Sequence, residues 1–168
     1  MNRGLLLTMT EPPAAMEEEF NAWYDDEHMA ERLAIPGFRS ARRWVADVAP
    51  GEGKYLATYE LDSPAVLTSR EYLQRFENQT PWSKRCLGKA VVFRRWACEQ
   101  SGAADPRSEA RHLLCVIAES PIALTVTGAL QVRRFVAGPT HIALAELSHP
   151  TLPPVKAGWE MRLYRAYA

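Results

Sequence analysis

Two hydrophobic patterns alternate along the first half of the chain. Residues 3–10 form a continuous apolar and β-tolerant run, which is typical of a strand buried on both faces. From residue 14 to about residue 33, apolar residues recur at spacings of three, four and seven, and acidic residues occupy the first turns. This pattern predicts an amphipathic helix, because the helix dipole favours acids at its start. Ile35-Pro36-Gly37 ends the helix.

The elements that follow continue the alternation. Ser63 and Pro64 suit the N-cap and first position of a second helix, which extends to about residue 77. An irregular segment follows at residues 80–83. The other predicted strands, the first two joined as a hairpin, are residues 38–48, 54–61 and 90–98. The order β-α-β-β-α-β is the ferredoxin-like arrangement, in which helices cover one face of a four-stranded antiparallel sheet.

The last third of the chain repeats the strand patterns of the first part. After a polar segment typical of a linker, four apolar segments recur in the same order: RGLLLTMTEPP and RHLLCVIAESP, PGFRSARRW and TGALQVRRF, KYLATYELDSP and THIALAELSHP, VVFRRW and RLYRAY. Only about eight and ten residues separate the later strands where helices would lie, too few for a three-turn helix. We therefore expect a ferredoxin-like repeat at residues 1–98, a linker at 99–110, and a second repeat without helices at 111–168.

The strands of this second repeat are apolar on both faces. One face can fill the interior, but we expect the other to lack a helical cover, since the intervening segments, residues 120–127 and 149–158, are short. A bare four-stranded sheet would expose more apolar surface than monomers usually tolerate. The sequence therefore predicts a homodimer through the helix-free face of the second repeat.

Composition narrows the classes of partner. The 168 residues are 47% hydrophobic and 24% charged, with 20 basic and 20 acidic side chains, so one compact chain without net charge is expected and nucleic acid is an improbable partner. The apolar start Leu5-Leu6-Leu7 is too short for a signal peptide or a membrane span, which predicts a cytoplasmic protein without a membrane partner. The three cysteines lack CxxC spacing and fit reduced, structural thiols.

Residues 20–43 carry a resemblance to a known family. The motifs WYDDEH, IPGF and ARRW resemble the EthD-type proteins of the dimeric α+β barrel superfamily. In that family two subunits pack sheet against sheet, so the resemblance implies an α+β fold here, with two tandem ferredoxin-like repeats forming an intramolecular dimeric α+β barrel. It also implies a ligand cleft between sheet and helices, and an activity such as monooxygenation, isomerisation or dehydration.

Candidate chemistry begins with His28, which lies one helical turn after Tyr24. An imidazole in this position can remove or return a proton near neutral pH, with the phenol as a second donor and Asp25 or Glu31 to fix its tautomer. The alternative is a surface or half-buried histidine without a catalytic role.

Arg42 and Arg43 lie on a predicted strand and so point to opposite faces. One of them reaches the cleft, where it can hold a carboxylate or stabilise an enolate, and the other faces the barrel interior. The sequence leaves open which is which, and a structural ion pair with a carboxylate such as Glu60 is the alternative.

Aromatic residues complete the predicted site. Trp23, Tyr59 and Trp82 are candidates for substrate binding, Trp82 as a rim residue on the irregular segment. No metal-ligand, dinucleotide, phosphate-loop or serine-hydrolase motif is present, so we expect neither a metal nor a cofactor. The leading hypothesis is a small enzyme that acts by proton transfer, as an isomerase, dehydratase or cofactor-free oxygenase, on a compact aromatic or polyketide-like molecule. The alternative is a non-catalytic ligand-binding or assembly protein that uses the same cleft.

Overall fold

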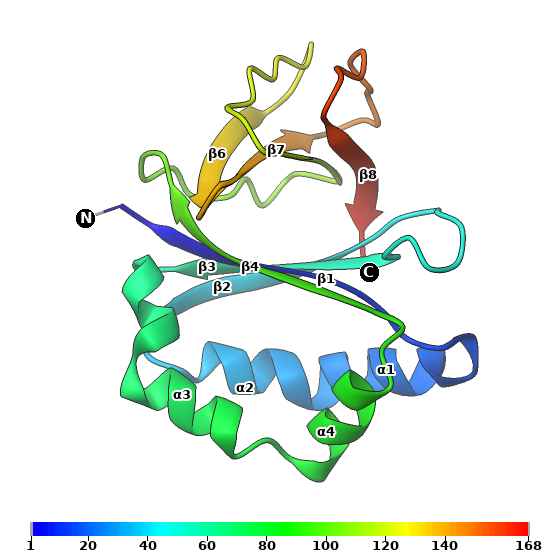
Figure 1. The fold of residues 1–168 in the computed structure, drawn as a ribbon, viewed down its shortest axis with the longest axis vertical. Helices are drawn as coiled ribbons and strands as arrows, with labels where there is room; N and C mark the ends of the chain where they lie inside the picture. The colour runs from blue at the N-terminus through cyan, green and yellow to red at the C-terminus, as the bar shows by residue number, and fades with distance from the viewer. Residues whose placement is uncertain (1, 168) are drawn as a thin grey trace.

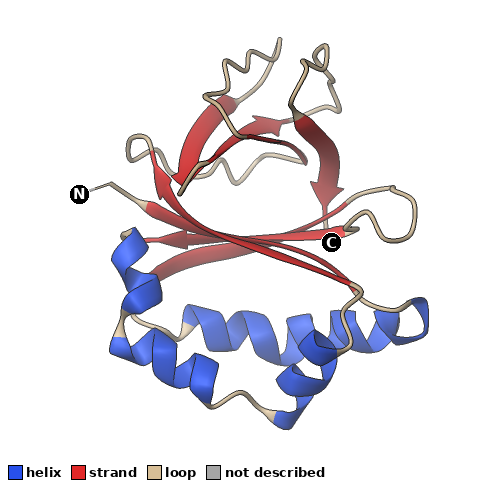
Figure 2. Ribbon diagram, in the orientation of Figure 1, coloured by secondary structure: helices blue, strands red, loops and turns tan. Residues whose placement is uncertain are grey.

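The computed structural model describes residues 2–167. Its strands are β1 (Gly4–Glu11), β2 (Phe38–Val45), β3 (Tyr55–Leu61), β4 (Val92–Gln100), β5 (His112–Ala118), β6 (Gln131–Ala137), β7 (Thr140–Leu147) and β8 (Glu160–Ala166). Its helical segments are η1 (Ala14–Met16), α1 (Glu17–Trp23), η2 (Tyr24–His28), α2 (Met29–Leu33), η3 (Pro64–Thr68), α3 (Arg70–Glu77) and α4 (Pro81–Gly88). All of the helices lie on one face of the sheet formed by β1 to β4, as Figures 1 and 2 show.

The eight strands form one closed antiparallel barrel in the order β1-β3-β2-β8-β5-β7-β6-β4. The prediction of two tandem ferredoxin-like repeats forming an α+β barrel is therefore wrong. Instead of two separate sheets stacked face to face, the edge strands of the two halves pair, through Trp44 with Ala166 and Val45 with Arg165 on one side and through Glu99 and Gln100 with β6 on the other. Closure pairs backbone groups that two separate sheets would leave open at their edges.

The hydrophobic core has three parts. The barrel interior is filled by side chains from both halves, including Leu7, Leu113 and Tyr164. A second cluster lies between β1 to β3 and the helices, around Phe20 and Trp23. The third lies on the outer face of the second half.

The outer face of the second half is covered by this chain itself. Ile122, Leu124 and Val126, on the extended segment between β5 and β6, are 6%, 2% and 7% exposed and pack on Val116 and other residues of β5 and β7. Short segments were expected to be too small for this task, but an extended chain needs no helix to bury every second side chain. The bare face from which a homodimer was expected is therefore absent from residues 2–167, and the homodimer itself stays a prediction.

The second predicted helix is divided, and a further helix is present where an irregular segment was expected. Ser63 caps the 3₁₀ segment η3, and Ser69 caps α3 by accepting a hydrogen bond from the Tyr72 amide. Thr80 caps α4 by accepting from the Ser83 amide, with Pro81 at the first position. Across residues 2–167, every helix falls short of the length and apolarity that a membrane span requires.

Candidate active site between the helices and the sheet

The helix from residue 14 to residue 33 changes its winding at the WYDDEH motif. Tyr24–His28 form a π-helical turn, η2, between two α-helical segments. Such turns are rare and often mark functional sites. The wider turn stacks the His28 ring on Trp23, five residues earlier, with ring centroids 4.3 Å apart. His28 also meets Tyr24 and Tyr59 edge-on, at 4.9 Å and 6.3 Å.

This turn lines a cavity of about 390 Å³ between the helices and the outer face of the sheet. Its lining is mostly apolar and aromatic. Leu73, Phe76 and Phe93 line it while being 44%, 54% and 50% exposed, so they mark its opening. The polar groups that line it include Thr8, Tyr24, His28, Arg32, Tyr59, Tyr72 and Arg95. A concave, largely apolar site with a few polar groups is the usual form of a small-molecule site.

Two buried hydroxyls in this lining have no hydrogen-bond partner within residues 2–167. They are Thr8 Oγ1 and Tyr59 Oη, on side chains that are 8% and 1% exposed. Buried polar groups are nearly always paired, so two orphans in one cavity point to a molecule that would complete them.

Electrostatics favour a neutral imidazole and a protonated phenol. Burial, and then the positive charges of Arg32 and Arg43, lower the pKa of His28 well below its ordinary value. Burial and the neighbouring Tyr24 raise the pKa of Tyr59 well above its ordinary value. At neutral pH the ring of His28 is therefore unprotonated and has a lone pair free for a proton, although the same surroundings make it a weaker base than free imidazole, while Tyr59 remains a hydrogen-bond donor.

Three of the predicted site residues meet in this cavity: Tyr24, His28 and Tyr59. Trp23 and Trp82 do not line it. Trp23 is fully buried behind His28, and its Nε1 donates to Ser83 Oγ and Glu27 Oε2 at 3.1 Å each. Trp82 is partly buried against the same hydrophobic cluster, on α4.

Arg42 and Arg43 point to opposite faces of β2, and Arg43 takes the helix side. Its guanidinium lies 4.1 Å from the centre of the Tyr24 ring and 4.2 Å from that of Tyr167, and it donates to Asn21 Oδ1 at 2.8 Å. Asp25, expected to orient His28, instead lies 3.8 Å from Arg43. Arg43 therefore joins the helix to the sheet and is absent from the cavity lining.

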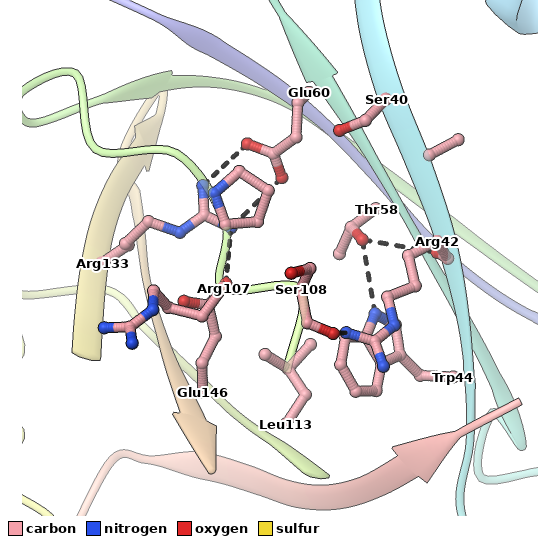
Figure 3. Close-up of a pocket in the computed structure, with 12 residues that line it drawn as sticks. Ser40, Arg42, Trp44, Thr58, Glu60, Arg107, Ser108, Leu113, Arg133 and Glu146 are labelled. Carbon is pink, nitrogen blue, oxygen red and sulfur yellow. Dashed lines mark hydrogen bonds and ion pairs between the residues drawn. The ribbon is translucent and has the colours of Figure 1, made fainter. Parts of the chain in front are cut away.

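Arg42 faces the barrel side, where Figure 3 shows it stacked on Trp44. It donates to the backbone carbonyls of Ala110 and Ser108, at 2.5 Å and 3.5 Å, and lines a second cavity of about 360 Å³ at the mouth of the barrel.

On the opposite wall of this second cavity, Arg133 lies between two buried carboxylates (Figure 3). It donates to both oxygens of Glu60, at 2.7 Å and 3.2 Å, and to Glu146 at 3.1 Å. Glu60 thus does form an ion pair, but with an arginine of the second half of the chain rather than with Arg42 or Arg43. Because the Arg133 guanidinium is already held by two carboxylates, the barrel mouth is a weaker candidate for catalysis than the cavity beside His28, even though Arg133 Nε has no partner within residues 2–167.

Sequence reasoning missed Thr8, Arg32, Tyr72 and Arg95. Signals for two of them were present: Arg32 follows His28 by four residues, and Thr8 is a polar residue inside an apolar strand. The cysteines contribute no nucleophile, since burial raises the pKa of Cys86 to about 11 and those of Cys98 and Cys115 to about 12.

Comparison with known proteins supports the architecture. No family model matches the chain, and no curated protein matches it. A solved structure described as "Crystal structure study of anthrone oxidase-like protein" aligns with a TM-score of 0.64, at 10% sequence identity, over 99% of this chain and 92% of that chain. The two chains share a fold. These comparisons do not assign the chain to the EthD-type family.

Proposed function

We propose that the chain is a small enzyme that transfers a proton to and from a compact aromatic or polyketide-like molecule bound between the helices and the sheet. The observation that carries this proposal is the convergence of a neutral, buried imidazole and two unpartnered hydroxyls on one apolar cavity. The structural neighbour, described as an anthrone oxidase-like protein, agrees with a flat aromatic ligand.

The common step is deprotonation of a carbon next to a carbonyl group. A ring nitrogen of His28 takes the proton, and the electron pair of the broken C–H bond moves onto the carbonyl oxygen as an enolate. Tyr59 Oη, which burial keeps protonated, donates a hydrogen bond to that oxygen. Return of the proton at another carbon gives isomerisation, and loss of a neighbouring hydroxyl group as water, with the proton supplied by His28, gives dehydration. Attack of the enolate on dioxygen, the oxidant, forms a C–O bond and a peroxide that takes the His28 proton; loss of water from this hydroperoxide, with cleavage of its O–O bond, leaves a ketone.

Hydrogen–deuterium exchange tests the step without knowledge of the final product. Anthrone, a tricyclic aromatic ketone with an acidic methylene group, would be incubated with the protein in D₂O, and loss of the methylene proton followed by NMR. We expect the wild type to accelerate exchange. His28→Gln should slow it by roughly 100-fold or more, in the range of general-base catalysis.

Matched variants separate chemistry from binding. His149→Gln changes an exposed histidine far from the cavity and should leave the rate unchanged. Tyr59→Phe should lower the rate while retaining affinity, because the hydroxyl acts on the enolate more than on the ketone. If anthrone and related ketones bind but exchange no faster than in buffer, the proposal is wrong and the cavity serves binding without turnover.

A further inference from the structure

Arg32 is a buried charge without a counter-charge. Its side chain extends from α2 into the cavity, and the residue is 9% exposed. None of the ion pairs within residues 2–167 includes it. Among the described residues that line the cavity, none is an Asp or a Glu.

A guanidinium in such a place has no anion within the described residues to offset its partial loss of hydration. Buried charges are ordinarily paired, because the free-energy cost of removing a charge from water exceeds the interaction energy that neutral neighbours supply. Arg32 does lie 5.6 Å from the centre of the Tyr72 ring, but contact with a ring face is a weak substitute for an anion. By contrast, Arg133 at the barrel mouth, which is 4% exposed, contacts two carboxylates. The cavity beside His28 therefore holds an unmatched positive charge that a ligand can neutralise.

A second arginine extends the positive charge toward the opening. Arg95, on the exposed part of β4, donates to Tyr72 Oη at 2.9 Å and lines the same cavity. Tyr72 is thereby fixed between the two guanidinium groups, which lie 5.6 Å and 5.9 Å from its ring centre. An entering anion would meet Arg95 first and Arg32 further in.

We infer that the ligand of this cavity is a carboxylic acid, with its ionised carboxylate on Arg32 and its apolar body against Leu73, Phe76 and Phe93. That this acid is also the substrate rests on the proposed function, whereas its binding to Arg32 does not. The charge of Arg32 acts on both His28 and Tyr59, so a carboxylate held there places the rest of the molecule beside the acid–base groups. The substrate class is therefore a compact aromatic or polyketide ketone that also carries a carboxylate, and anthrone represents its reacting ketone alone.

Calorimetric titration with 2-naphthoate and with its neutral isostere, 2-naphthamide, tests the inference. The wild type should bind the acid roughly 10- to 100-fold more tightly than the amide, as expected for hydrogen bonds to a charged group. Arg32→Met, which keeps the apolar stem, should abolish this preference and leave the affinity for the amide unchanged. Arg165→Met removes an exposed arginine on β8 and should leave both affinities unchanged.

Thermal unfolding of the free protein distinguishes a ligand-binding arginine from a structural one. Arg32→Met should leave the unfolding temperature unchanged or raise it, since no ion pair is lost, whereas replacement of a structural arginine would lower it. If Arg32→Met does not fold, Arg32→Lys supplies the comparison and should reduce the acid preference, because a lysine lacks the fork that matches a carboxylate.

Equal affinity of the wild type for acid and amide, or an acid preference that survives in Arg32→Met, would overturn the inference. The results of this binding titration do not depend on the results of the hydrogen–deuterium exchange assay. Loss of the acid preference together with exchange that depends on His28 would leave the proton-transfer proposal standing. A preference for the acid without exchange would leave only the binding site.

Discussion

Replacement of Arg133 by methionine should destabilise the fold more than any change to a surface ion pair. Arg133 is 4% exposed and makes three charged hydrogen bonds, two to Glu60 and one to Glu146, which are themselves 7% and 2% exposed. Without the guanidinium, two carboxylates remain buried with no cation between them. Removal of one partner from such a group costs about 3–5 kcal/mol. For a chain of this length that corresponds to a fall in Tm of roughly 6–20 °C.

Urea denaturation at pH 7 measures this loss in the free energy of unfolding, and two control variants show whether it comes from the stranded carboxylates. Arg165→Met breaks a pair with Asp47, whose side chain is 88% exposed, and should cost about 1 kcal/mol or less. A triple variant, with Glu60→Gln and Glu146→Gln added to Arg133→Met, removes the stranded charges and should recover most of the stability. The single variant should also regain stability as the pH falls, because its unpaired carboxylates acquire raised pKa values and take up protons in the folded state.

A loss in Arg133→Met no larger than that in Arg165→Met would refute this reasoning. A triple variant no more stable than the single one would do the same. Either result would mean that water or a rearranged side chain compensates the carboxylates. Glu60 belongs to β3 and Arg133 to β6, so the ion pair joins the two halves of the barrel and its loss should act on global unfolding.

Two further changes test local features. The free energy of unfolding should fall as the pH drops below about 6.5, because the unfolded chain then binds a proton at His28 that the folded chain excludes, and it should not depend on this ring at higher pH. Urea denaturation from pH 5 to 8 tests this: the free energy of unfolding of the wild type minus that of His28→Gln should decrease toward acid, and parallel curves would contradict the burial argument. Gly37→Ala should cost about 1–3 kcal/mol, because this residue has φ = 95° and an added Cβ would lie 2.5 Å from Val66 Cγ2. Gly51→Ala, at φ = 91° with open space around it, controls for the backbone alone, and an equal loss in both variants would mean that Val66 moves aside.

The order of elements in the first half could be predicted because each carries a local signal. Spacing identified the long helix, Ser63 marked the second helical region, and Gly37 marked the turn into β2. The closure of the barrel could not be predicted in the same way. It depends on short pairings between edge strands that are far apart in the chain, such as Trp44 with Ala166. A pattern of polar and apolar residues indicates which face of a strand is buried, but not which strand pairs with its edge.

The segment that covers the outer face of the second half could also be predicted only in part. The pattern correctly indicated that a segment near residue 120 has too few residues for a helix, and the structure, which describes this segment throughout, contains none there. It did not indicate that Ile122, Leu124 and Val126 alternate with exposed residues and lie on the sheet as an extended strap. Alternation in a segment without strand partners can bury apolar surface as a strand does, so a missing helix does not imply a missing cover.

The sequence predicted three of the residues that line the cavity, and there is a physical reason why it did not indicate the arginine that lines it. Strand alternation placed Arg42 and Arg43 on opposite faces, but it could not show that one guanidinium would be held by aromatic rings and Asn21 and the other by backbone carbonyls. An arginine is available to a ligand only if the fold leaves it without partners. Arg32 meets that condition, since it follows the π turn by one α-helical turn and reaches a cavity whose described lining contains no carboxylate. The feature that favours Arg32 for the proposed binding role is therefore the absence of a counter-charge, which depends on the whole lining and not on any single motif.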